Sequence, residues 1–287
     1  MKALTRRWKS LRATVRHTLW PTRSLTVCRA LLRGKAGLEI GGPSEIFADI
    51  GALSLYSLVD RLDNCDFAHQ TAWRESIREG RHYAYHPKCP PGYQYVREAV
   101  DLHGVPSAQY DVVLSSHNLE HIANPLRALR EWLRVLKEDG VFVLVVPHRD
   151  GAFDHRRPVT PVVHLVEDEE RGIGEDDLTH LPEILALHDR AKDASMPSFE
   201  EFKRRSERNV ENRCLHHHVF TTETVLALLD RVGLQILAVD PLYPYHIVAV
   251  SRKPAWGRAP DNHAWLDTNA EYRSRSPFPS DRRSSIA

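Results

Sequence analysis

The stretch that decides the fold is residues 110–122, which read YDVVLSSHNLEHI. Residues 110–114 form a short apolar run of strand length, and residues 115–118 follow as a polar loop. A buried strand that ends in polar residues is typical of an α/β sheet, in which ligands bind at the carboxyl ends of the strands. This stretch therefore predicts both a central strand and one wall of a binding site.

A helix and a second buried strand are predicted directly after this loop. Asn124 can cap the helix, and Pro125 suits its first turn because its missing N–H has no partner there in any case. Four leucines recur on one face of this helix: Leu126, Leu129, Leu133 and Leu136. Asp139-Gly140 ends it, and residues 141–146, VFVLVV, have the uniform apolarity of a strand buried on both faces.

The same alternation extends toward the N-terminus. Residues 37–44, GLEIGGPS, predict a first strand that ends in a glycine-rich turn. A second strand is expected over residues 54–59, closing at Asp60, and a third over residues 93–100 with Asp101 at its end. Strands that alternate with helices in this way predict a Rossmann-like fold with a mostly parallel sheet.

Beyond this sheet region the pattern changes. Residues 151–218 are rich in His, Asp, Glu and Arg and are predicted to be a largely helical insertion. Ser198 to Glu201 form a capping-box pattern that should begin a charged helix. After the insertion we expect a helix at 221–231 and strands at 234–239 and 246–250. Residues 254–287 combine Pro, Ser, Arg and Asp and are expected to be a disordered tail.

The overall composition narrows the class of protein. A chain of 287 residues with 42% hydrophobic side chains can bury a full core. Its four cysteines are widely separated, which indicates neither a zinc ribbon nor a disulfide scaffold and favours a cytoplasmic location. A net charge of +1 gives no reason to expect nucleic-acid binding.

Residues 1–35 form a basic N-terminal extension, because ten Lys and Arg residues precede Glu39, the first acidic residue. Its apolar residues Trp8, Leu11, Val15 and Leu19 have helical spacing. The extension is interpreted as a solvated helix that leads into the domain, with weak contact to an anionic membrane surface or an acidic partner as the alternative. No stretch is long enough to span a bilayer.

The glycine-rich turn and one carboxylate together predict a nucleotide-like ligand. Backbone N–H groups at Gly41 and Gly42 can approach a ligand closely, because glycine has no side chain to block them. Asp60 follows Glu39 by twenty-one positions, near the ~20-residue spacing at which a carboxylate binds a ribose in such folds.

At this point the sequence resembles the class I S-adenosylmethionine-dependent methyltransferases, in particular the type-11 group. Residues 37–42 look like the cofactor loop of that family, and residues 110–122 look like its fourth strand and the loop that follows. The resemblance covers roughly residues 36–150 and 219–252 and implies a methyltransferase domain over residues 36–253 with a seven-stranded sheet. It also implies S-adenosyl-L-methionine as the cofactor and residues 151–218 as an acceptor-binding lid.

The resemblance also assigns cofactor contacts. It places Glu39, Gly41, Gly42 and Ser44 beside the methionine part, Asp60 on the ribose, Asp101 and Leu102 beside the adenine, and Ser116 and His117 next to the substrate. Pro43 departs from the family pattern, because it stands where a second glycine is expected and has no N–H to donate.

Methyl transfer needs a positioned acceptor and, for a hydroxyl acceptor, a base. The candidate bases are Asp154, His155 and His117. Arg156 and Arg157, which should emerge at the carboxyl edge of the sheet, and His217 are candidates for binding the acceptor. The alternative for residues 154–157 is a surface loop held by Asp–Arg ion pairs.

Seven polar residues of the insertion raise the question of a metal: His164, His180, His188, Asp189, His216, His217 and His218. None of their separations matches H-E-x-x-H or another known ligand spacing, so we expect no metal site.

The function predicted from the sequence is therefore methyl transfer to a small-molecule or sugar-like acceptor, in bacterial polysaccharide or secondary-metabolite synthesis. Two alternatives remain open. One is an NAD-dependent oxidoreductase, although the full G-x-G-x-x-G fingerprint is absent. The other is an inactive relative that binds without turnover, for which Pro43 is the main reason.

Overall fold

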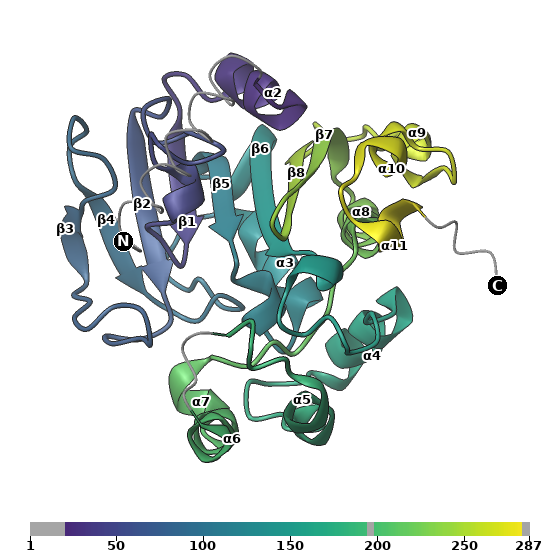
Figure 1. The fold of residues 1–287 in the computed structure, drawn as a ribbon. Coiled ribbons are helices and arrows are strands. Elements are labelled where there is room, and N and C mark those ends of the chain that lie inside the picture. The colour runs from purple at the N-terminus through teal and green to yellow at the C-terminus, as the bar shows by residue number, and fades with distance from the viewer. Residues whose placement is uncertain (1–20, 194–197, 283–287) are drawn as a thin grey trace, which may run out of the picture.

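A computed structural model describes residues 21–193 and 198–282 and contains one eight-stranded sheet. The strand order is β3-β4-β2-β1-β5-β6-β8-β7 (Figure 1). The strands are β1 (Ala36–Ile40), β2 (Arg61–Asp66), β3 (Gly80–Tyr83), β4 (Gly92–Val96), β5 (Tyr110–Ser116), β6 (Leu136–Pro147), β7 (Gln235–Leu242) and β8 (His246–Arg252). β4, β2, β1, β5 and β6 are parallel, whereas β3 at one edge and β8 near the other are antiparallel to their neighbours. The predicted Rossmann-like fold is confirmed, with β3 as one strand beyond the expected seven.

The central strands are buried on both faces, as their apolar runs predict. Along β6, Val141, Val143 and Val145 pack into the cluster on one face of the sheet. Phe142 and Leu144 alternate with them and pack into the larger cluster on the other face. The two faces therefore share a strand that is buried continuously over residues 140–147, which is the arrangement of a doubly covered parallel sheet.

Ten α-helices are described, and they surround the sheet (Figure 1). They are α2 (Arg23–Leu31), α3 (Pro125–Val135), α4 (Val162–Arg171), α5 (Leu181–Leu187), α6 (Phe199–Glu207), α7 (Asn209–Asn212), α8 (Thr222–Arg231), α9 (His263–Leu266), α10 (Glu271–Arg275) and α11 (Pro279–Arg282). The predicted start of α3 is confirmed, because the Asn124 side chain accepts a hydrogen bond from the Arg127 backbone N–H and Pro125 occupies the first turn. α3 ends at Val135 and β6 begins at Leu136, so the predicted helix end at Asp139-Gly140 and the predicted strand start at 141 are wrong.

The second strand was predicted in the wrong place. Residues 54–59 form turns whose apolar side chains, such as Leu55 and Val59, fill the core, and β2 follows at Arg61–Asp66. β2 was missed because its buried positions carry the polar residues Asp63, Asn64 and Asp66 instead of an apolar pattern. Asp60 therefore lies before β2, where its backbone N–H donates to Lys35 O, and not at the end of the strand.

The third strand is shorter than predicted. β4 covers Gly92–Val96, so that Asp101 lies five residues beyond its end and not directly after it. The hairpin partner β3 was not predicted at all, because its four residues carry no apolar alternation.

The segment 151–218 is helical, and α4 to α7 gather at the end of the sheet toward which the parallel strands run (Figure 1). The predicted cap of α6 is confirmed, since the Ser198 hydroxyl accepts from the Glu201 N–H and donates to the Glu201 carboxylate. Both ends of the segment are fixed at the sheet, because Arg149 N donates to Phe220 O and Thr160 N donates to Val219 O.

The prediction of a disordered C-terminal tail is wrong for the described residues up to 282. Trp265, Tyr272 and Phe278 are buried against the domain. Asp281 is also buried, and its carboxylate accepts hydrogen bonds from His148 Nε2 and from the hydroxyls of Thr222 and Ser276. The tail was misjudged because its few apolar residues are widely spaced and its polar residues form a buried network.

Of the basic extension, residues 1–20 lie outside the described part, and with them the predicted helical spacing of Trp8, Leu11, Val15 and Leu19. The described helix α2 is part of the domain, because Leu25 and Cys28 are buried and Ser24 N donates to Asp240 Oδ2. Among the described residues, no helix is both long and apolar enough to cross a bilayer.

We predict that Asp281→Ala lowers the free energy of unfolding by about 3 kcal/mol at pH 7, because it leaves His148 and two hydroxyls unpaired in the core. Burial opposes ionisation of Asp281, but the hydrogen bonds from His148, Ser276 and Thr222 hold its pKa below the ordinary value. The stabilisation is therefore present above the pKa of an unfolded Asp and is lost as the pH falls below about 4.

Urea unfolding at pH 7 and pH 3 measures this difference, which should shrink at the lower pH. Asp267→Ala is the matched control, since Asp267 is an exposed carboxylate of the same segment with only a local hydrogen bond to Asn269 N. Equal stability of the two variants at pH 7 would contradict the prediction.

Candidate functional site

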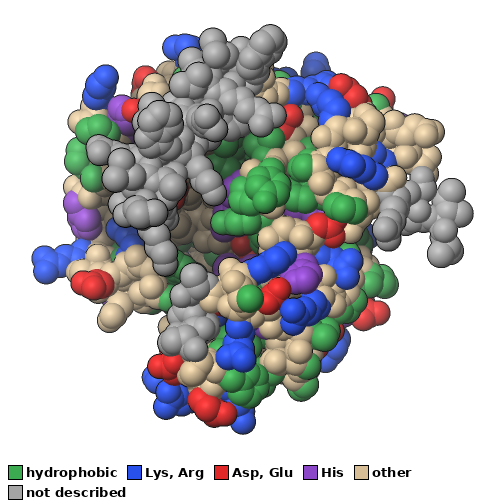
Figure 2. Space-filling view, in the orientation of Figure 1, with side chains coloured by type: hydrophobic (Ala, Val, Ile, Leu, Met, Phe, Trp, Pro, Cys, Tyr) green, Lys and Arg blue, Asp and Glu red, His purple; other side chains and the backbone are tan. Residues whose placement is uncertain are grey.

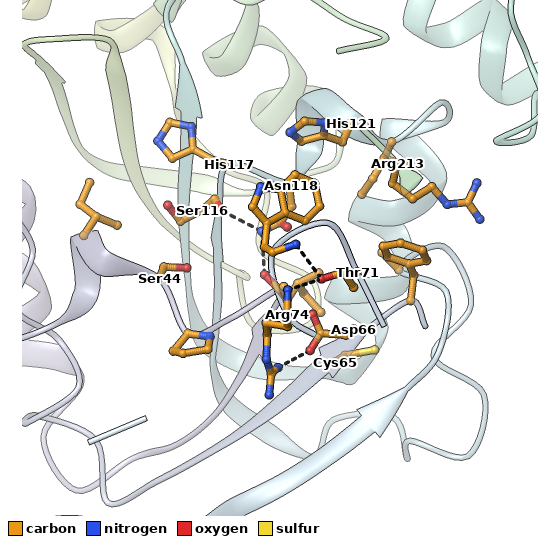
Figure 3. A pocket seen from close by; sticks show the side chains of 18 of the residues that line it. Ser44, Cys65, Asp66, Thr71, Arg74, Ser116, His117, Asn118, His121 and Arg213 are labelled. Atoms are coloured by element: carbon orange, nitrogen blue, oxygen red, sulfur yellow. Dashed lines mark hydrogen bonds and ion pairs between the residues drawn. The ribbon is translucent and has the colours of Figure 1, made fainter. Parts of the chain in front are cut away.

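A cavity of about 1250 Å³ opens at the carboxyl ends of β1, β2, β4 and β5 (Figure 3). One side is formed by the glycine-rich turn and the ends of these strands, and the other by residues of the helical segment and of the β7–β8 turn. The polar lining residues are Ser44, Glu45, Asp66, Thr71, Arg74, Arg97, Glu98, Ser116, His117, Asn118, His121, Glu175, Arg213 and His246.

The turn after β1 is packed so closely that it requires glycine at two positions. Gly41 has φ +75°, and a Cβ built on it would lie 2.1 Å from the Asn118 side-chain oxygen. A Cβ on Gly42 would lie 2.3 Å from both the Glu39 carboxylate and the Tyr83 hydroxyl. Asn118, in the loop after β5, fixes this turn, because its side-chain amide donates hydrogen bonds to Ile40 O and Ser116 O. Gly41 therefore lines the cavity with bare backbone.

Glu39 supports this turn from behind and does not line the cavity. Its carboxylate is fully buried and accepts hydrogen bonds from the Ser44 hydroxyl at 2.7 Å, the Tyr83 hydroxyl at 2.6 Å and the Tyr56 hydroxyl at 3.0 Å. Burial raises the pKa of Glu39, and these hydrogen bonds oppose the rise. In this structure Glu39 positions the turn, with Ser44 as its link to the cavity wall.

Asp66 is the carboxylate at the end of β2 and lines the cavity. Oδ2 accepts from Arg74 at 2.6 Å, from Asn64 at 2.8 Å and from Gln94 at 3.2 Å. Within the described residues Oδ1 has no hydrogen-bond partner, so one oxygen is left for a ligand. Burial raises the pKa of Asp66, against the opposing effect of the Arg74 guanidinium. This residue occupies the position that was predicted for Asp60.

Asp60, Asp101 and Leu102 lie outside the cavity wall. Asp101 is exposed, and Leu102 is buried in the core, with its N–H donating to Glu131. Instead of these residues, the chain lines the cavity with residues 97–100, which directly follow β4.

Ser116 at the end of β5 and His117 in the loop that follows both line the cavity. His117 Nε2 lies 2.9 Å from His246 Nδ1, so the two imidazoles share a hydrogen bond between β5 and β8. Burial lowers the pKa of His246 to about 3, and nearby His117 adds to this effect. His246 is therefore neutral at pH 7, and Tyr245 packs beside both rings.

The opposite wall carries the ion pair of Glu98 with Arg213 at 2.6 Å, and Glu175 lies 3.6 Å from the same guanidinium. Glu175 accepts a hydrogen bond from Ala123 N. Burial raises the pKa of Glu175 to about 7, although Arg213 lowers it. Charged groups of the helical segment therefore border the cavity, but not the ones that the sequence suggested.

Five predicted catalytic and substrate-binding residues are absent from the wall of this cavity. His155 and Arg156 both contact Asp189, at 3.0 and 3.5 Å, in the surface ion-pair arrangement that was the alternative interpretation. Arg157 is buried and donates to His216 O and His217 O as well as to Glu183. These contacts hold the extended chain before α8 in place.

Asp154 and His217 are buried in the same region. Asp154 Oδ2 lies 2.8 Å from His216 Nδ1, and the His217 ring contacts the Asn209 amide. These polar contacts join loops that are far apart in the sequence, so residue spacing along the chain could not predict them. The roles assigned to these residues from sequence are therefore not supported by their positions.

The structure also brings histidines together that the sequence spacing did not relate. One group consists of His164, His180 and His218, and another of Glu120, His121 and His216. The ligand atoms of each group lie within 4.8 Å of one another. The expectation of no metal site was based on spacing alone, and the folded chain supplies two clusters that this spacing conceals.

Comparison with protein families gives one match, a model described as a methyltransferase domain, over residues 16–239. The chain belongs to this methyltransferase family. It is a class I S-adenosylmethionine-dependent methyltransferase, and S-adenosyl-L-methionine is its cofactor. No curated protein matched the sequence.

Several solved structures with a similar fold are described as methyltransferases. One from Mesorhizobium loti is 16% identical with a TM-score of 0.45, covering 81% of this chain and 98% of that chain. One from Methanosarcina mazei is also 16% identical with a TM-score of 0.45, over 80% and 97% of the two chains. The 1,6-didemethyltoxoflavin-N1-methyltransferase of Burkholderia thailandensis, with its substrate and S-adenosylhomocysteine bound, is 14% identical with a TM-score of 0.42, over 84% and 82%. Similarity at this level does not identify an acceptor.

We predict that Gly41→Ala lowers the affinity of this methyltransferase for S-adenosylhomocysteine at least about tenfold, because the new methyl group displaces Asn118 and the turn with it. Gly104→Ala is the matched control: Gly104 has φ +80°, so it carries the same backbone strain, but no atom lies within 4 Å of its Cβ position. Isothermal titration calorimetry with S-adenosylhomocysteine checks both variants, and equal losses of affinity would contradict the steric argument.

Proposed function

We propose that this methyltransferase transfers a methyl group to a small, sugar-like acceptor that binds between the cofactor turn and residues 151–218. The single observation that supports this is the cavity of about 1250 Å³, bordered on one side by the turn and on the other by Glu175 and Arg213 of the helical segment. Pockets for one small molecule measure roughly 300–1,000 Å³, so this cavity is large enough for a cofactor and an acceptor together.

The strand ends are suited to hold the cofactor. Gly41 offers close approach of the backbone to the methionine part, and Pro43 stands beside it without filling the cavity. Asp66 offers a free carboxylate oxygen for the ribose hydroxyls, in place of Asp60, and Ala99 and Val100 offer an apolar edge for the adenine. These residues fit S-adenosylmethionine, which argues against the inactive alternative that Pro43 suggested.

When bound, the cofactor supplies a methyl group on a positively charged sulfur, and transfer requires the acceptor to lie in line with the sulfur–carbon bond. The protein's part is to position the acceptor and to exclude water from the cavity. For a hydroxyl acceptor, the base is His117, which lines the cavity and is positioned by a 2.9 Å hydrogen bond to the neutral His246. Of the candidate bases expected from the sequence, His117 alone has this position.

Two aromatic side chains favour a sugar-like acceptor. Trp73 is 63% exposed and Tyr245 is 38% exposed, and both border the cavity. Exposed aromatic rings that carry a polar group offer an apolar surface together with hydrogen bonding, and this combination suits the faces of a sugar ring. A role in bacterial polysaccharide or secondary-metabolite synthesis, and a cytoplasmic location, belong to the proposal and follow from the sequence resemblance and the separated cysteines.

We predict that Asp66→Asn weakens binding of S-adenosylhomocysteine about 10- to 100-fold, because hydrogen bonds to a charged group contribute roughly 1.5–3 kcal/mol. Asp60→Asn, at the opposite end of β2, should leave the affinity unchanged, since Asp60 is exposed and outside the cavity. Calorimetry on the two variants decides which aspartate binds the ribose. A loss in Asp60→Asn alone would restore the assignment made from sequence.

The proposed activity is tested by incubating the protein with S-adenosylmethionine and a panel of sugars, nucleotide sugars and small phenols, and by measuring S-adenosylhomocysteine and the methylated product by mass spectrometry. We expect turnover with a sugar-containing acceptor and its loss in His117→Ala at unchanged cofactor affinity. Binding of the cofactor without product from any acceptor would favour the inactive alternative, and turnover with phenols alone would overturn the acceptor class.

A further inference from the structure

Three side chains beside the cavity form a compact group that methyl transfer itself does not require. Glu120 and His121 come from the loop after β5, and His216 comes from the extended chain before α8. One ligand atom of each lies within 4.8 Å of those of the other two. Figure 3 shows His121 in the cavity wall, and Figure 2 shows histidine side chains beside the hollow on this face of the molecule.

Glu120 is the unexplained member of the group. Its side chain is 1% exposed, and neither carboxylate oxygen has a hydrogen-bond partner. His117 Nδ1 lies 3.4 Å from Oε1 without the geometry of a hydrogen bond. A buried carboxylate without partners is costly unless a positive charge accompanies it.

The two histidines are held in the way that metal-binding histidines are held. His121 Nδ1 lies 3.0 Å from Leu215 O, and His216 Nδ1 lies 2.8 Å from Asp154 Oδ2. Each Nδ1 therefore carries the proton, and each Nε2 keeps a free lone pair. Such partners on the second ring nitrogen fix the tautomer and the orientation of a metal ligand.

We propose that Glu120, His121 and His216 bind a divalent transition-metal ion of the zinc class. Two imidazole nitrogens and one carboxylate oxygen are a donor set that Zn²⁺ accepts, with a further position left for water or substrate. Bonds of about 2.0–2.2 Å place the donor atoms of a tetrahedral site roughly 3.4 Å apart, so atoms up to 4.8 Å apart move closer together when the ion binds.

The position of Glu120, His121 and His216 beside the cavity indicates a role for the bound ion. Because His121 lines the cavity, an ion held there has its open side toward the acceptor, where it lowers the pKa of a bound hydroxyl as a Lewis acid. This second part rests on the proposed function, whereas binding of the ion does not. Asp154, predicted from sequence as a base, becomes a positioning residue for His216.

The other histidine group provides an internal comparison. His164 Nε2 and His180 Nε2 lie 3.1 Å apart, and His218 Nε2 donates to Ala123 O. His164 and His180 are thus bonded to each other and His218 to the backbone, and none of the three borders the cavity. His180→Gln therefore removes a histidine of the same kind from a site that the proposal does not involve.

The test uses the full chain without a histidine tag, treated with a chelator and then titrated with Zn²⁺ by calorimetry, with Co²⁺ as a spectroscopic probe. We expect tight binding to the unaltered protein and a loss of at least about tenfold in affinity in Glu120→Gln and in His216→Gln. The visible bands of bound Co²⁺ should disappear in both variants and persist in His180→Gln. Glu120→Gln keeps the shape of the side chain and removes its buried charge, so circular dichroism should show that it folds.

Two results would overturn the proposal: no Zn²⁺ binding by the unaltered protein, or loss of binding in His180→Gln with retention in Glu120→Gln. Titration with S-adenosylhomocysteine reports separately on the proposed function. Asp66→Asn should lose the adenosyl ligand and keep the metal, because Asp66 is not among the three ligands.

Discussion

A buried carboxylate at the end of β1 determines the arrangement of the cofactor side of the molecule. Glu39 is enclosed by protein, and leaving its charge unpaired would cost several kcal/mol, so the donors around it have little freedom. Ser44, Tyr56 and Tyr83 reach it from three different segments. The hydrogen bonds that the buried Glu39 carboxylate needs fix the conformation of the turn between Glu39 and Ser44. Within this turn, no side chain larger than hydrogen fits at Gly42.

The buried hydrogen-bond network around this turn extends into the neighbouring strand β2. Asn64 accepts from the Gly42 N–H and donates to Asp66, while Arg74 donates to the Gly42 carbonyl and to Asp66. The turn and the carboxylate at the end of β2 are thus parts of one buried network, in which a fully satisfied set of partners specifies a single geometry. This network explains why β2 contains Asn64 and Asp66 where a parallel strand normally contains valine or isoleucine. Asp63 on the same strand instead accepts hydrogen bonds from Tyr93 N and the Tyr110 hydroxyl.

Elements whose buried side chains are apolar could be predicted from the sequence, whereas elements whose buried side chains are polar could not. β5, α3 and β6 were predictable because their side chains follow the periods of a strand or a helix. β2 and the helices after residue 262 were not, because their buried residues pair with partners distant in the chain, as Asp281 pairs with His148. Ser116 and His117 could be located from the strand that they end. Asp66, Glu175 and Arg213 could not, since only the folded chain brings them to the cavity.

The ion pair between Glu98 and Arg213 joins the two halves of the cavity, because Glu98 follows β4 and Arg213 lies after α7. A molecule that settles against β4 restrains Glu98 and, through the guanidinium, the helical wall where the second molecule must bind. One ion pair thereby connects the side of the cavity that carries Ala99 and Val100 with the side that carries Glu175.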